Sequence, residues 1–183
     1  MHEIRVITKG KDLLAIGPKT FKEFITPFVK EKSYLSVQKV PTLAQQRAWV
    51  AARAKEIDKK ALFYVLLFSD GKLVGDCSAH LASERQSERH NVYFGLAISK
   101  SHRGMGWGEK LLRRAIVEAK KRFKPHRIWI EHTEGNLPAR RLYQKVGFVE
   151  VGRLNEYHNH HGRFVDKILM QYKPNSRTKP NKR

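Results

Sequence analysis

The chain has 183 residues with 37 Lys and Arg against 17 Asp and Glu, which gives a formal net charge of +20 at pH 7. Its 40% hydrophobic and 10% aromatic content exclude a disordered polyelectrolyte, and the longest apolar run, 61–68, is too short to span a bilayer. We expect one globular domain over 1–173 and a flexible basic tail over 174–183.

The first half of the chain predicts one strand, two helices and a hairpin. Apolar residues at helical spacing indicate the first helix, which Pro27 shortens or breaks. Thr42 and Gln45 match a capping box at the start of the second helix. Gly71 can take the positive φ of the hairpin turn. The predicted elements are a strand over 4–8, helices over 21–29 and 42–60, and paired strands over 61–68 and 73–81.

The second half alternates strands with two amphipathic helices. The longer helix carries an apolar face opposite a basic one, and Gly147 ends the shorter helix. Helices placed among strands indicate an α/β or α+β domain. The predicted elements are strands over 90–98, 127–133, 148–155 and 163–172, and helices over 107–123 and 137–146.

A glycine-rich turn lies between the strand over 90–98 and the helix over 107–123. Backbone N–H groups and the positive end of a helix dipole converge in such a turn, which therefore binds anions such as phosphate. The turn matches neither a P-loop, because Lys110 does not directly follow a correctly spaced glycine, nor a dinucleotide-binding loop, because Glu109 stands where a glycine is required.

The turn and the helix over 137–146 together resemble two motifs of the GNAT superfamily of N-acetyltransferases. The acetyl-CoA loop of that family, [QR]-x-x-G-x-[GA], is matched by Arg103, Gly106 and Gly108. The second motif is matched by Asn136, Ala139, Tyr143, Gly147 and Phe148. The closing segment 151–170, with its turn at His161 and Gly162, and residues 46–49 are similar to the branch of RimJ/RimL-type ribosomal-protein acetyltransferases.

The resemblance implies a single mixed, mostly antiparallel sheet of about seven strands, flanked by helices. Its strands over 90–98 and 127–133 splay apart to admit acetyl-CoA, and the family needs no metal. Carried over to this chain, the residues expected to bind acetyl-CoA are Leu96, Ala97, Ile98, Arg103, Gly104, Met105, Gly106, Trp107, Gly108, Asn136 and Ala139.

The resemblance also implies direct attack of a neutral amine on the thioester. Tyr143 matches the tyrosine that protonates the leaving thiolate, although a packed core tyrosine is the alternative. The proton acceptor stays open. Glu88 and His90 lie at the start of one central strand and Glu131 and His132 lie on the other, and alternation lets only one residue of each pair face the cleft. The candidates retained are Glu131 and His90. About one α-amine in ten is neutral at pH 7, against about one lysine in 2,500, which favours an α-amine as acceptor.

These observations predict an acetyl-CoA-dependent N-acetyltransferase that acts on a protein N-terminus of the ribosomal-protein type. We expect it to be cytoplasmic, without membrane contact, and either monomeric or homodimeric. A small amine is the alternative acceptor if Glu84, Glu88, Glu131 and Glu134 line the cleft, because a +20 protein otherwise repels cations. A protein of the same fold that binds RNA or the ribosome without catalysis is the second alternative. We expect Cys77 in the core, and His158, His160 and His161 in an exposed turn rather than at a metal.

Overall fold

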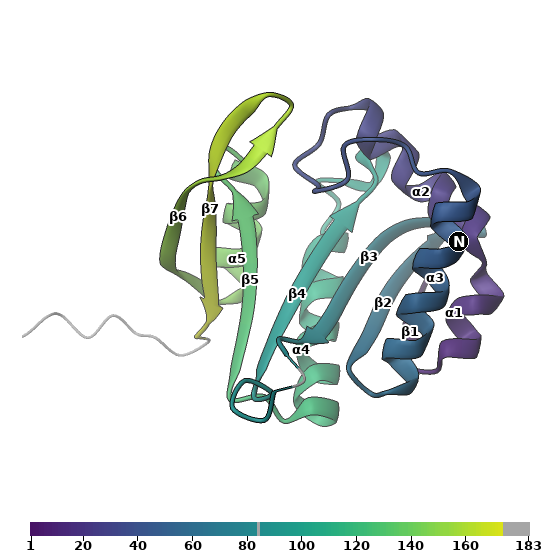
Figure 1. The fold of residues 1–183 in the computed structure, drawn as a ribbon, viewed down its shortest axis with the longest axis horizontal. Helices are drawn as coiled ribbons and strands as arrows, with labels where there is room; N and C mark the ends of the chain where they lie inside the picture. The colour runs from purple at the N-terminus through teal and green to yellow at the C-terminus, as the bar shows by residue number, and fades with distance from the viewer. Residues whose placement is uncertain (84, 174–183) are drawn as a thin grey trace, which may run out of the picture.

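A seven-stranded sheet runs through the protein, with helices on both of its faces (Figure 1). The computed structural model describes residues 1–83 and 85–173, so the predicted basic tail and Glu84 lie outside the described residues. The strand order is β1-β2-β3-β4-β5-β7-β6. The strands are β1 (His2–Ile7), β2 (Leu62–Ser69), β3 (Lys72–Leu81), β4 (Asn91–Ile98), β5 (Arg127–Thr133), β6 (Phe148–His160) and β7 (Arg163–Tyr172).

Only the β4–β5 pair of this sheet is parallel, and all other neighbouring strands are antiparallel. The predicted mixed, mostly antiparallel sheet is therefore confirmed. The helices of the described part are α1 (Gly10–Ile16), α2 (Pro18–Lys30), α3 (Leu43–Asp58), the 3-10 helix η1 (Lys100–His102), α4 (Trp107–Phe123) and α5 (Leu137–Val146). None of these helices is long and apolar enough to cross a bilayer.

Two hydrophobic cores cover the two faces of the sheet. The first core packs α4 and α5 against one face, and the second packs α1, α2 and α3 against the other. Every residue of β2 is buried, because alternate side chains enter the two cores. This arrangement explains why 61–68 reads as a continuous apolar run, and it places Cys77 in the first core as predicted.

Helix α1 is not among the predicted elements, because a long-range contact rather than a local pattern defines it. The backbone N–H of Gly10 donates to Asp58 Oδ1 at 2.7 Å, which ties the start of α1 to the end of α3. A Cβ at Gly10 would lie 2.4 Å from the Asp58 carboxylate, so only glycine fits there. A seven-residue helix held by one distant carboxylate leaves no periodic pattern to detect.

Helix α2 continues through Pro27 to Lys30, so the prediction of a short or broken helix is wrong. Phe24 and Phe28 are both buried in the second core with ring centroids 5.1 Å apart, and this packing offsets the hydrogen bond that Pro27 removes. The Thr26 hydroxyl donates to the Lys22 carbonyl at 2.7 Å within the same turn. Strand β6 also runs further than predicted, to His160, past an irregularity between Leu154 and His158.

Candidate functional site

Strands β4 and β5 pair along only half of their length. Their register runs from Asn91 opposite Arg127 to Phe94 opposite Ile130 and ends there. Beyond that point Gly95–Ile98 still pairs with β3, and Glu131–Thr133 still pairs with β7, but the two segments do not pair with each other. Figure 1 shows the two strands diverging toward this end. The predicted opening between the two strands is therefore present, with the unpaired backbone edges of 95–98 and 131–133 facing each other. We call this opening the splay.

The glycine turn follows directly from the unpaired end of β4. Gly104 and Gly106 have φ values of +76° and +79°, which side chains rarely tolerate, and a Cβ at either position would meet nothing within 4 Å. Gly106 caps α4 without a side-chain hydrogen bond, so the N–H groups of the first helical turn point outward. Open space, free donors and the helix dipole fit a phosphate group at this turn.

The side chains of the turn serve to anchor it. The Arg103 guanidinium pairs with Glu31 at the end of α2, and its Nε donates to the Ile98 carbonyl at 2.8 Å. Trp107 stacks on the His2 ring with centroids 4.6 Å apart, and the Lys110 ammonium lies 4.3 Å from the Trp107 ring centroid. Met105 is 61% exposed. Trp107 therefore ties the start of α4 to β1.

Helix α5 supplies the residues of the second motif. Asn136 caps the helix, with its side chain accepting from the Ala139 N–H at 3.3 Å. Tyr143 is buried in the first core, with its ring centroid 6.3 Å from that of His132 and 6.2 Å from that of Phe148. Burial raises the pKa of the Tyr143 phenol, and the neighbouring Cys77 and Glu131 raise it further, so the hydroxyl stays protonated and can donate.

Glu131 and His132 point to opposite faces of β5. His132 is buried on the α4 and α5 side next to Tyr143, and its Nε2 has no hydrogen-bond partner within the described residues. Glu131 lies on the other face, at the unpaired end, with Oε2 2.9 Å from Lys167 Nζ. Of Glu131 and His132, it is therefore Glu131 whose carboxylate lies beside the splay.

His90 lies at the opposite, closed end of the same strand pair. Its carbonyl accepts from the N–H groups of His126 and Arg127, and its ring packs edge-on against that of His126. Five residues of extended chain, about 16 Å, separate His90 from the first unpaired residue of β4. The structure therefore brings Glu131 and Tyr143 to the splay but does not bring His90 there.

A carboxyl group that the sequence analysis did not single out lies beside the same splay. Asp76 on β3 is the register partner of Ala97 on β4 and shares its face of the sheet. The signal was the alternation of polar Asp76, Ser78 and His80 with buried Cys77 and Ala79 along β3. Alternation identifies a polar face, but only the strand order shows that this face adjoins the splay.

The segment after α2, residues 31–41, forms a strap that joins the two halves of the sheet. The Tyr34 ring stacks on His160 at the tip of the β6–β7 hairpin, with centroids 4.8 Å apart, and the Gln38 side chain donates to the Asn159 carbonyl. Figure 1 shows this loop beside the hairpin at the wide end of the splay. His158, His160 and His161 lie near this contact, and no group of three metal-binding side chains is found within residues 1–83 and 85–173.

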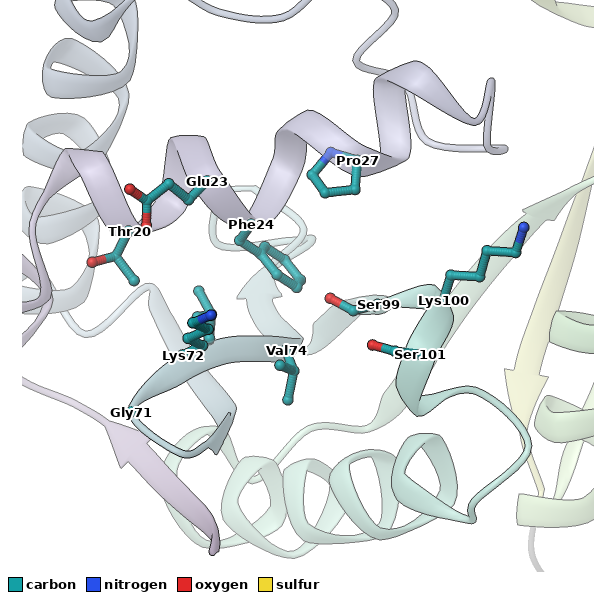
Figure 2. A pocket seen from close by; sticks show the side chains of 11 residues that line it. Thr20, Glu23, Phe24, Pro27, Gly71, Lys72, Val74, Ser99, Lys100 and Ser101 are labelled. Atoms are coloured by element: carbon teal, nitrogen blue, oxygen red, sulfur yellow. The ribbon is translucent and has the colours of Figure 1, made fainter.

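A pocket of about 610 Å³ lies beside the splay rather than in it (Figure 2). Phe24 and Pro27 of α2, Val74 of β3 and the segment Ser99–Ser101 line part of it. None of the residues predicted to bind acetyl-CoA or to act in catalysis lines this pocket. The pocket is therefore separate from the site that the two motifs define.

Two acids of α4 form ion pairs with part of its basic face. Glu109 pairs with Arg113 at 2.9 Å and with Lys145 at 2.7 Å, and Glu118 pairs with Arg114 and Arg122. Ion pairs three or four residues apart are typical of a solvated helix surface.

Comparisons with known proteins agree with this geometry. The model of the acetyltransferase (GNAT) family matches residues 27–148. A probable spermine N(1)-acetyltransferase of Bacillus subtilis subsp. natto is 34% identical over 92 residues, which are 49% of this chain and 60% of that protein. A ribosomal protein bS18 alanine N-acetyltransferase of Haemophilus influenzae is 36% identical over 78 residues, 42% of this chain and 52% of that protein. The chain thus spans little more than half the length of these relatives.

The fold also matches solved structures over almost the whole chain. The crystal structure of a ribosomal-protein-alanine N-acetyltransferase from Brucella melitensis superposes with a TM-score of 0.75 and 24% identity, and covers 92% of this chain and 98% of that one. At this identity the likeness shows a shared fold.

Proposed function

Because the chain belongs to the acetyltransferase (GNAT) family, we propose that it transfers an acetyl group from acetyl-CoA to a primary amine. The observation that carries the proposal is the open glycine turn at the end of the unpaired stretch of β4. The edge of β4 that does not pair with β5 suits the amide groups of a pantetheine arm, which we expect along Leu96, Ala97 and Ile98, and the turn suits the pyrophosphate.

The roles of the remaining residues follow from their places around the splay. Asn136 and Ala139 begin α5, on the β5 side of the opening. The protonated Tyr143 hydroxyl would supply the proton that the departing thiolate needs. Glu131 would orient the incoming amine from the opposite face of β5. His90, about 16 Å of strand away, has no part in this proposal.

The acceptor that we propose is a protein N-terminal α-amine, as in the ribosomal-protein type of enzyme. The bS18-modifying relative and the larger neutral fraction of an α-amine support this choice. Three of the acids that would attract a free polycation are already ion-paired: Glu131 with Lys167, Glu134 with Arg153, and Glu88 with Arg85 at 3.8 Å.

A small amine is the second candidate acceptor, and the relative named as a spermine acetyltransferase favours it. The two acceptors are distinguished by titrating the full chain with acetyl-CoA in a calorimeter and then measuring thiol release with peptides or with spermine. We expect micromolar acetyl-CoA binding and faster thiol release with free-N-terminus peptides than with spermine. Absence of acetyl-CoA binding would refute the enzyme proposal and direct attention to RNA binding, with its steep salt dependence.

A further inference from the structure

Asp76 lies on β3, one strand away from the splay and on the face of the sheet that the second core covers. Its register partner, Ala97, belongs to that core, and the next register pair joins Gly75 to Ile98 at the last position of β4. The backbones of such cross-strand partners are about 5 Å apart. Most of Asp76 is enclosed, but part of the residue remains accessible. The carboxyl group therefore adjoins the strand end at which the acetyl group is proposed to bind.

Asp76 is also a carboxyl group without a cation in a strongly cationic protein. Glu131, Glu31 and most other acids form ion pairs, whereas within the described ranges Asp76 forms none. Its contact is the backbone N–H of Ala97, which lowers its pKa but is outweighed by burial, so the pKa of Asp76 rises to about 7. Keeping an enclosed carboxyl group unpaired destabilises the fold, which points to a functional reason for its presence.

We propose that the Asp76 carboxylate accepts the proton that the acceptor ammonium must lose before it attacks the thioester. This role rests on the proposed acetyl transfer and makes Asp76 a catalytic residue of it. The ammonium gives one proton to Asp76, and the freed nitrogen lone pair forms the C–N bond. The C–S bond then breaks, the thiolate takes the Tyr143 proton, and the new amide returns its surplus proton to Tyr143. Asp76 finally releases its proton to water.

The acceptor amine must be acidic enough to give its proton to a carboxylate such as Asp76. Transfer from an α-ammonium with a pKa near 8 to a carboxylate with a pKa of about 7 is unfavourable by about tenfold. The same transfer from a lysine with a pKa of about 10.4 is unfavourable by about 2,500-fold. The two transfers differ by about 250-fold, a ratio set by the pKa values of the amines, so a weak base such as Asp76 can serve an α-amine far more readily than a lysine side chain.

Few other groups near Asp76 titrate in the same pH range. Tyr64, two residues from the β2 partner of Asp76, has a pKa raised mainly by burial, and Asp76, Arg53 and Glu56 also act on that pKa. Cys77, next in the chain, points into the first core with a pKa that burial raises well above its usual range. His80, four residues along on the same face, has a pKa lowered mainly by burial. His80 is therefore the group whose titration must be separated from that of Asp76.

The test compares wild-type protein, Asp76→Asn and the control His80→Gln by thiol release between pH 5.5 and 9.5. The acceptors are tetrapeptides with free α-amines that differ in their first residue, an N-acetylated tetrapeptide with one lysine, and spermine. The step requires carboxylate and ammonium together, so kcat/KM of the wild type should be bell-shaped, with limbs near pH 7 and 8 for the α-amine peptides.

We expect Asp76→Asn to lower kcat/KM at pH 7.5 by about 10²-fold or more and to replace the bell with a single rise toward pH 8, while His80→Gln keeps the bell. Acetyl-CoA affinity measured by calorimetry should be unchanged in both variants, and Asp76→Ser repeats the test if Asp76→Asn does not fold.

A bell-shaped profile retained by Asp76→Asn, with kcat/KM within threefold of wild type, would overturn the role of Asp76 alone. Loss of the acidic limb in His80→Gln would assign that limb to the imidazole and overturn it equally. Transfer to spermine but to no peptide would overturn the selection for α-amines. A wild-type protein that binds acetyl-CoA but acetylates none of these acceptors would overturn the proposed function together with this inference.

Discussion

Replacing Gly106 by alanine separates the conformational role of the glycine turn from its proposed role in phosphate binding. Gly106 has φ +79° with open space around its Cα, so an added methyl group clashes with no protein atom. The left-handed conformation still costs a residue other than glycine about 1–2 kcal/mol. In a protein of this size, such a loss lowers Tm by about 2–8 °C.

A matched control exists at the far hairpin, where Gly162 has φ +93° and likewise meets nothing within 4 Å of a built Cβ. Gly162→Ala should therefore lose about the same stability as Gly106→Ala. Only Gly106→Ala places a methyl group in the proposed phosphate cradle, so only this variant should weaken acetyl-CoA binding, by about tenfold or more, or about 1.4 kcal/mol. Thermal unfolding and calorimetry measure the two effects, and equal acetyl-CoA affinities in the two variants would refute the phosphate-binding role of the turn.

Three further predictions follow from described contacts. Tyr143→Phe should lower kcat by about 10²- to 10⁴-fold with acetyl-CoA affinity unchanged, because the thiolate loses its proton donor; unaltered turnover in the thiol-release assay would remove Tyr143 from the mechanism. Thr42→Ala removes one half of the capping box that starts α3 and should cost about 1 kcal/mol in urea unfolding, and an unchanged unfolding midpoint would contradict a stabilising cap. Burial raises the pKa of Asp76 from 3.8 to about 7, so the folded state holds an extra proton between these values, and the associated stability is lost as the pH rises through 7. Asp76→Asn should therefore raise Tm relative to wild type more at pH 8 than at pH 5, whereas the same difference at both values would argue against the raised pKa.

Sequence patterns predicted the second half of the fold well because its signals are local. The bounds of α4, β5 and α5 match the predicted ranges, and for the two helices an amphipathic period with flanking glycine and asparagine caps defines them. Helix α1 has no such pattern, because its position depends on the distant Asp58 carboxylate. The continuity of α2 past Pro27 likewise depends on tertiary packing of Phe24 and Phe28.

The same division between local and distant information applies to the site. The glycine turn is one contiguous segment between a strand and a helix, so its residues could be named from sequence. Asp76 acquires its place only through the antiparallel pairing of β3 with β4, which sets it across from Ala97. The choice between Glu131 and His132 depended on which face of β5 packs against α4 and α5, and a strand sequence does not contain that information.

The short β4–β5 ladder gives the sheet two internal edges as well as its two outer ones. Unpaired strand edges are sites at which a sheet can recruit further hydrogen-bonding partners. Between these edges the strand-to-strand link consists of four register pairs, so the halves β1–β4 and β5–β7 meet in a short hinge. A ligand whose amides bond to both edges would act as a missing strand and stiffen that hinge. At a ligand concentration of 100 times Kd, binding would add about 2.7 kcal/mol to the free energy of unfolding. The Tm of this protein would therefore report how much of it is bound to the ligand.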